Sequence, residues 1–395
     1  MLTDRITRMT PSATIELEGI VADLHAAGVP VIALNAGEPD FETPSNIADA
    51  CDRAVRAGKT RYVNINGIPE LRNAICDKFK RDSNVTYAPN EIVVSTGAKQ
   101  ALFNTVETLV QQGDEVIIPV PCWVSYIEMV KLAEGTPVLV DTFENFHLDI
   151  EAIKKKISPK TKAIMINSPC NPTGVVYYRE ELQQLVDLAI KHDFFIISDE
   201  IYEKLVYDGR DNICVASFSE EAKQHTVIIN GFSKSYAMTG WRIGYCAAPA
   251  KIARGICSLQ GHTTSNSTTF VQWAALEALT GPQDSVYRMK EEFDRRRTYL
   301  LERIKAIPGI KCQNAEGAFY LLPDVSSYFG KKTPEGKVIA NSIDISSYLL
   351  SEAKLAILPG AAFEAPKCIR IAYSNSVDNI RKGMDAMAEA LAKLK

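Results

Sequence analysis

Short, almost wholly apolar runs alternate with longer amphipathic segments through the middle of the chain, and this alternation restricts the possible folds most. Runs such as AIMIN and FFIIS are typical of strands buried on both faces of a parallel sheet. The segments between them include Lys99–Gln111 and Arg179–His192, which have helical patterns. We therefore predict an α/β domain with a mostly parallel, seven-stranded sheet. Its expected strands are Glu91–Ser95, Glu115–Ile118, Pro137–Asp141, Lys162–Ile166, Phe194–Ser198, Thr226–Asn230 and Ile243–Ala247.

The pattern changes after about Gly281. A long charged helix, Asp284–Ile307, precedes short strand candidates and a terminal helix. The beginning of the chain contains only a helix and the strand Val31–Asn35, which is too little to fold alone. We expect residues 46–280 to form a large domain, and residues 1–45 with 281–395 to form a smaller α+β domain. The later strand candidates are Ala318–Leu322, Ala356–Leu358 and Cys368–Tyr373.

Composition excludes several classes of protein. The 44 Lys+Arg and 48 Asp+Glu residues give a net charge of −4, so neither nucleic acid nor an anionic membrane is an expected partner. The first twenty residues lack the apolar core of a signal peptide, and no apolar run approaches a membrane span. The nine cysteines form no C-x-x-C pair and no cluster with histidine, so we expect neither a disulfide framework nor a metal site. These features favour a cytoplasmic protein with reduced thiols.

Unusual residues follow several of the expected strands. In doubly wound sheets, ligands bind beyond the carboxyl ends of the strands, so these side chains should meet at one edge. Together they offer a lysine and a carboxylate, as pyridoxal 5'-phosphate (PLP) requires: an amine that condenses with its aldehyde, and an acid that keeps its pyridine nitrogen protonated. The residues are Gly97, Ala98, Lys99, Trp123, Asn171, Asp199, Tyr202, Ser233 and Lys234.

Lys234 and Asp199 are the candidates for these two roles. Lys234 follows the buried run TVIIN, and partial removal from water there favours the neutral, nucleophilic amine. The alternative is a solvated loop lysine. Asp199 ends the run FFIIS and either pairs with a pyridinium or only caps a following helix. Tyr202, one helical turn further, is placed to donate a hydrogen bond to the ring's phenolic oxygen.

The cofactor phosphate needs amide donors and positive charge. Gly97 and Ala98 lie between a strand and a helix, where free N–H groups hold anions, and Ser233 and Arg242 can complete the site. Trp123 either stacks on the ring or belongs to the core. Arg370 lies in the apolar run CIRIAY and needs a partner, either an internal carboxylate or the α-carboxylate of an amino or keto acid.

These residues resemble the class I (fold type I) PLP-dependent aminotransferases. The resemblance extends over nearly the whole chain, in the right order. The motifs that carry it are Gly37–Phe41 (GEPDF), Asn171–Gly174 (NPTG), Asp199–Tyr202 (DEIY) and Gly231–Gly244 (GFSKSYAMTGWRIG).

The resemblance implies a role for each matched residue. Lys234 is then the Schiff-base lysine, Asp199 the partner of the pyridine nitrogen, and Arg370 the ligand of the α-carboxylate. Tyr62 matches a tyrosine that reaches the phosphate of the neighbouring subunit, which implies a homodimer with composite active sites. Asn171 and Tyr202 flank the phenolic oxygen, Trp123 stacks on the ring, Gly37 lies near the substrate, and Gly97, Ala98, Ser233 and Arg242 bind phosphate.

Within the family the chain looks most like the bacterial-type aspartate aminotransferases of subgroup Ib, through Pro11–Thr14 (PSAT), Gly97–Phe103 and Trp123–Tyr126. The resemblance implies that Lys99, with Ser12 and Thr14, binds the distal carboxylate of aspartate or 2-oxoglutarate; Lys99 could instead balance the phosphate charge.

Relatives that accept prephenate tend to carry a basic residue before PSAT, where this chain has Thr10. The alternatives are an aromatic, alanine-type or prephenate aminotransferase, a PLP C–S β-lyase, and a non-enzymatic regulator.

Overall fold

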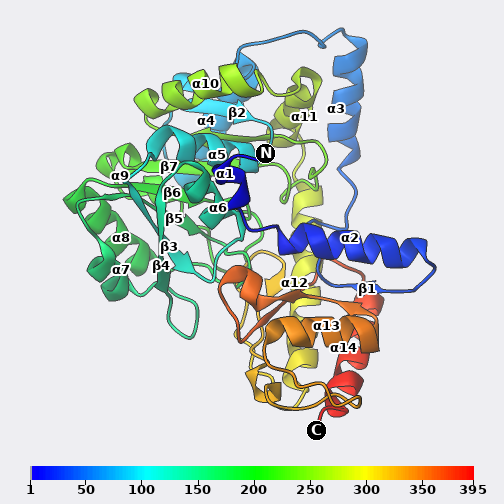
Figure 1. Cartoon of the computed structure of the whole chain (residues 1–395). Coiled ribbons are helices and arrows are strands. Elements are labelled where there is room, and N and C mark those ends of the chain that lie inside the picture. Colours follow the sequence, from blue (N-terminus) through cyan, green and yellow to red (C-terminus); the bar gives the residue numbers. More distant parts are fainter. Residues whose placement is uncertain (1) are drawn as a thin grey trace.

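A computed structural model describes residues 2–395, without the side chain of Arg5. Its centre is a seven-stranded sheet in the order β2-β8-β7-β6-β5-β3-β4, which confirms the predicted mostly parallel sheet (Figure 1). Strand β8 runs antiparallel to both of its neighbours, β2 and β7, and the other pairs of adjacent strands are parallel. The strands are β2 Ile92–Ser95, β3 Glu115–Val120, β4 Thr136–Asp141, β5 Thr161–Asn167, β6 Phe195–Asp199, β7 Thr226–Gly231 and β8 Gly244–Ala247.

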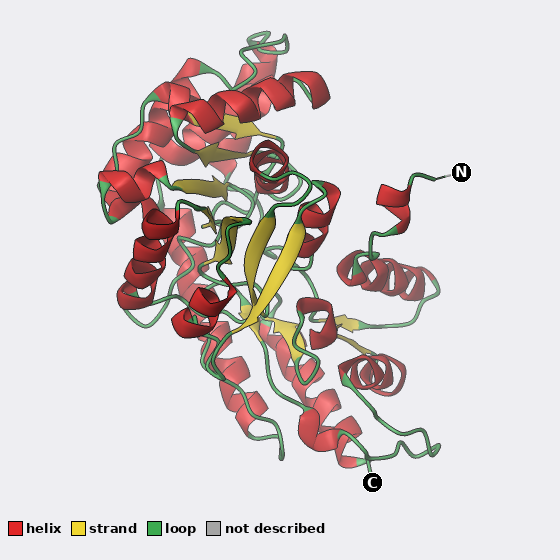
Figure 2. Cartoon of the chain, turned by 60° about the vertical axis from the view of Figure 1, so that its left-hand side comes forward, coloured by secondary structure: helices red, strands yellow, loops and turns green. Residues whose placement is uncertain are grey.

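Helices cover both faces of this sheet, because alternate strand residues face opposite sides. In β5, Ala163 and Met165 belong to one hydrophobic cluster, whereas Ile164 and Ile166 belong to another. Figure 2 shows the strands between the helices. The first face packs on α5 Ala98–Leu109, α6 Ser125–Leu132 and α10 Ala250–Thr263. The second packs on α4 Pro69–Ser83, α8 Arg179–His192, α9 Glu220–Gln224 and α11 Thr269–Thr280. Two more helices lie around this body, α3 Ser45–Arg56 and α7 Ile150–Lys156.

A separate hydrophobic cluster unites the end of the chain with part of its beginning. Leu34 packs with residues of α12 Asp284–Lys305, α13 Ser342–Ala353 and α14 Val377–Ala392. In Figure 1, α12 (yellow) extends from the large sheet toward α13 and α14. This arrangement is compatible with a small domain made from both chain ends, but the boundaries at residues 45/46 and 280/281 stay a prediction.

Five short strands form two small sheets beside this cluster. In the first, β1 Ile32–Ala33 pairs in parallel with β10 Leu355–Ala356, and in the second, β11 Leu358–Pro359, β12 Ile369–Ala372 and β9 Tyr320–Leu321 pair antiparallel. The single strand expected at 356–358 is therefore wrong: the chain changes sheets there. Two N-terminal helices, α1 Asp4–Thr7 and α2 Ala13–Ala26, precede β1. Within residues 2–395, no helix is both long and apolar enough to cross a membrane.

Candidate active site

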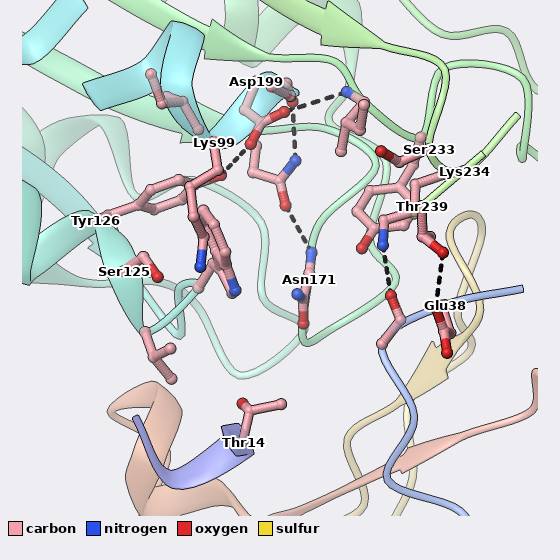
Figure 3. Close-up of a pocket in the computed structure, with 18 of the residues that line it drawn as sticks. Thr14, Glu38, Lys99, Ser125, Tyr126, Asn171, Asp199, Ser233, Lys234 and Thr239 are labelled. Carbon is pink, nitrogen blue, oxygen red and sulfur yellow. Dashed lines mark hydrogen bonds between the residues drawn. The ribbon is translucent and has the colours of Figure 1, made fainter. Parts of the chain in front are cut away.

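The cavity that contains Lys234 lies beyond the carboxyl ends of β5, β6 and β7, and has a volume of about 400 Å³. All of the predicted site residues line it except Gly97, which adjoins it, and Tyr62. Four parts of the described chain contribute: the central sheet, the start of α2 through Ser12 and Thr14, the loop after β1 through Gly37 and Glu38, and the C-terminal part through Tyr320 and Arg370. In Figure 3, Thr14 points into the cavity from the side opposite Asp199.

Asp199 is the last residue of β6 and is buried. One carboxylate oxygen accepts a hydrogen bond from the Tyr126 hydroxyl (2.7 Å), and the other accepts one from the Ile201 N–H (3.2 Å). Burial raises the pKa of Asp199 to about 6, although these hydrogen bonds and the charge of Lys234 oppose the rise. A nearby cation would therefore stabilise the charged form of this carboxyl group.

The segment after Asp199 differs from the sequence-based expectation. Residues 201–204 form a turn rather than a helix, so Asp199 caps no helix and Tyr202 does not lie one helical turn along it. Tyr202 nevertheless lines the cavity, and its hydroxyl lies 3.0 Å from that of Tyr320. Tyr320 comes from β9, far away in sequence, and no local signal marked it.

Lys234 follows β7 through the turn at residues 232–233 and is half-buried. Its amine donates a hydrogen bond to the Gly37 carbonyl (Figure 3). Burial lowers the pKa of Lys234 to about 8, with a further lowering from the positive charges of Arg370 and Arg242; Glu38 and Asp199 act in the opposite direction. A substantial fraction of the amine is therefore neutral in mildly alkaline solution.

A chain of hydrogen bonds joins Asp199 to Arg370. The Asn167 side chain donates to the Asp199 carbonyl (2.8 Å), and it accepts from the Asn171 N–H (2.7 Å). The Asn171 side chain in turn accepts from Arg370 (3.0 Å). Asn167 was absent from the predicted site, although as a polar residue ending a buried strand it carried the same signal as Asp199. Tyr126 lies in the matched segment Trp123–Tyr126, but the sequence indicates no role for it.

Arg370 is buried, with 2% of its surface exposed. Its guanidinium donates to Asn171 and to the Asn35 carbonyl (2.8 Å), and it lies over the rings of Tyr320 and Phe363. Among the described residues it forms no ion pair, and its Nε atom has no hydrogen-bond partner. The internal carboxylate considered as one possible partner is therefore not found within the described part of the chain.

Gly97 and Arg242 lie against each other at the start of α5. A Cβ atom on Gly97 would come within 2.6 Å of the Arg242 guanidinium, and Gly97 has a φ of +84°, which favours glycine. The first turn of a helix leaves N–H groups without partners inside the helix. With Ser233 and Ala98 lining the same cavity, this corner combines free amides, a hydroxyl and a cation, as a phosphate requires.

Lys99 and Trp123 lie at another wall of the cavity. The Lys99 amine is 4.8 Å from the centre of the Trp123 ring and forms no ion pair with a described residue. Burial lowers the pKa of Lys99, and Arg242 adds to this effect. Tyr62 lies apart, on the surface, with 89% of its area exposed in the single chain.

Comparison with known proteins identifies the family. The model of the aminotransferases of class I and II matches residues 29–387. The chain belongs to this family. The solved structure of an aspartate aminotransferase from Rhizobium meliloti covers 100% of both chains with a TM-score of 0.97 at 37% identity. That from Thermus thermophilus with maleate covers 99% of both, with a TM-score of 0.93 at 41% identity.

Curated relatives agree with this assignment. An aspartate aminotransferase of a Bacillus species (strain YM-2) is 46% identical, covering 98% of this aminotransferase and 97% of the relative. A probable aspartate/prephenate aminotransferase of Aquifex aeolicus is 44% identical, and the alignment covers 100% of this chain and 99% of the relative. The predicted family and fold class are thus confirmed, and family members depend on PLP.

Proposed function

We propose that this aminotransferase transfers the amino group between L-aspartate and 2-oxoglutarate, with PLP bound to Lys234. One observation carries the substrate class: Arg370 and Lys99 line the same cavity as Lys234, and neither is paired with a protein carboxylate among the described residues. Two such cations suit a substrate with two carboxylates. The names of the relatives support the same choice.

The residues around Lys234 suit the cofactor. Asp199 would hold the pyridine nitrogen in its protonated form, and Tyr202 and Asn171 would lie beside the phenolic oxygen. When bound, PLP supplies an aldehyde and a ring that withdraws electrons from the substrate. The phosphate would lie against Gly97, Ala98, Ser233 and Arg242, with Trp123 against the ring.

The protein's own contribution begins with Lys234. Its lowered pKa lets the amine accept the proton from Cα of the amino acid, as a general base must. Arg370 would orient the α-carboxylate through its planar fork, beside Gly37. Lys99, with Ser12 and Thr14, would bind the distal carboxylate and thereby fix the Cα–H bond relative to Lys234.

A homodimer with composite active sites is part of this proposal. Tyr62 is a large aromatic residue with 89% of its surface exposed in one chain. Such exposure suits a residue that contacts a second subunit. We propose that its hydroxyl reaches the phosphate bound by the partner. The two-domain division and a cytoplasmic location stay predictions.

A single-turnover screen tests the proposed activity. One amino acid at a time is added to the purified, PLP-loaded protein, and the absorbance change that accompanies formation of pyridoxamine phosphate is recorded. Aspartate and glutamate should react. Lys99→Ala should lower the single-turnover rate with these two amino acids and leave the rate with other amino acids unchanged. Reaction of aromatic acids alone would overturn the dicarboxylate assignment, and release of pyruvate and ammonia without a keto acid would indicate a β-lyase.

Prephenate is a second candidate acceptor, favoured by relatives named aspartate/prephenate aminotransferases. Thr10 stands where a basic residue was expected for this activity, and its N–H donates to Glu128 (3.2 Å). The purified protein is loaded with pyridoxamine phosphate instead of PLP and mixed with prephenate. The rate at which the PLP absorbance returns measures this activity directly.

A further inference from the structure

Glu18 is an acidic residue that lines the proposed substrate cavity together with Lys99 and Arg370. Glu18 belongs to α2, as do Thr14 and Ile15, which also line the cavity. Positions 14, 15 and 18 are three and four apart and therefore share one helix face. Glu16, on the same helix, does not line the cavity.

The Glu18 carboxylate is not committed to the fold. It is exposed and forms no hydrogen bond or ion pair with a described residue. Its charge nevertheless acts on the two cations assigned to the substrate, because it raises the pKa of both Lys99 and Arg370 against the lowering caused by burial. A carboxylate in this place competes with any anion that approaches Lys99.

We propose that Glu18 is a specificity-determining residue that competes with the distal carboxylate of the substrate for Lys99. It weakens the binding of dicarboxylates, and it gives the Lys99 ammonium an anionic neighbour when an uncharged side chain enters. The inference rests on the proposed function, since it needs a substrate carboxylate at Lys99.

Binding of maleate to the PLP-loaded protein tests this role without turnover. Isothermal titration calorimetry should give a dissociation constant for Glu18→Gln roughly threefold to tenfold lower than for the wild type, as expected for removal of one solvent-exposed repelling charge. Glu16→Gln is the matched control, because it removes the same charge from the same helix outside the cavity. The gain should shrink when the salt concentration rises from about 0.02 M to about 0.5 M, since salt screens exposed charges.

A second readout concerns selectivity. The ratio of kcat/KM for aspartate to that for phenylalanine should rise in Glu18→Gln and stay unchanged in Glu16→Gln. Equal maleate affinity in Glu18→Gln and wild type would overturn the inference, and so would an equal gain in both variants. Lys99→Ala separates the two proposals: if it fails to weaken maleate binding, the distal-carboxylate site itself is wrong.

Discussion

Asp199 and Lys234 are two oppositely charged groups whose pKa values burial shifts toward each other. The pKa of Asp199 rises to about 6, and that of Lys234 falls to about 8. In both cases the dominant cause is the loss of water around the charged form. Burial of either charged form costs free energy of folding, and a bound ligand with an opposite or complementary group offsets that cost.

The Asp199 shift has a consequence for stability that can be measured. Between about pH 4 and 6 the folded protein holds a proton that the unfolded chain releases, because the folded pKa is the higher one. Asp199 therefore makes the folded state less stable as pH rises through this range. In Asp199→Asn this contribution is absent.

We expect the stability of Asp199→Asn, relative to the wild type, to increase by about 1 kcal/mol between pH 5 and pH 7. Urea titrations of the cofactor-free proteins measure this difference. Glu16→Asn, which changes an exposed acid outside the cavity, is the control for effects of the substitution itself. A difference that stays constant with pH would mean that the pKa of Asp199 is not raised.

At the level of elements, the junction between β2 and α5 places the proposed phosphate site. Gly97→Ala puts a side chain at positive φ and against the flexible end of Arg242, which must move. We expect a loss of about 1–2 kcal/mol of stability, and PLP binding about tenfold weaker.

Gly113 provides the control for this change. It has a similar φ of +95°, but a Cβ atom there would meet nothing within 4 Å. Gly113→Ala should therefore lose comparable stability and retain its PLP affinity, measured by equilibrium titration. Equal affinity in the two variants would show that Gly97 and Arg242 do not bind the phosphate.

Sequence patterns located the elements of the large sheet within about two residues, because buried strands need continuous apolar runs. They could not show that β8 is antiparallel, since the side-chain pattern of a buried strand is the same in both directions. The expectation that polar residues beyond the carboxyl ends of the strands meet at one edge of the sheet correctly placed Asp199, Asn171 and Lys234 together. It could not find Tyr320 or Glu18, because β9 and α2 reach the cavity only through the packing of remote segments.

For the whole molecule, the exposed Tyr62 bears on assembly. We expect the protein to sediment as a dimer, and Tyr62→Phe to weaken PLP binding about tenfold by removing one hydrogen bond to a charged group. The stability of the single folded chain should not change, because the Tyr62 side chain is exposed there. Tyr287→Phe is the control, because it changes another tyrosine whose surface is 63% exposed. It should alter neither PLP affinity nor stability. A monomer with full PLP affinity would contradict the composite site.

The central claim is that Lys234 is the residue to which PLP is attached. Reduction of the purified, PLP-loaded protein with borohydride, followed by peptide mass spectrometry, tests it directly. We predict one pyridoxyl adduct, on the peptide that contains Lys234, together with loss of both the adduct and turnover in Lys234→Ala. An adduct on a different lysine, or turnover retained in Lys234→Ala, would contradict the account.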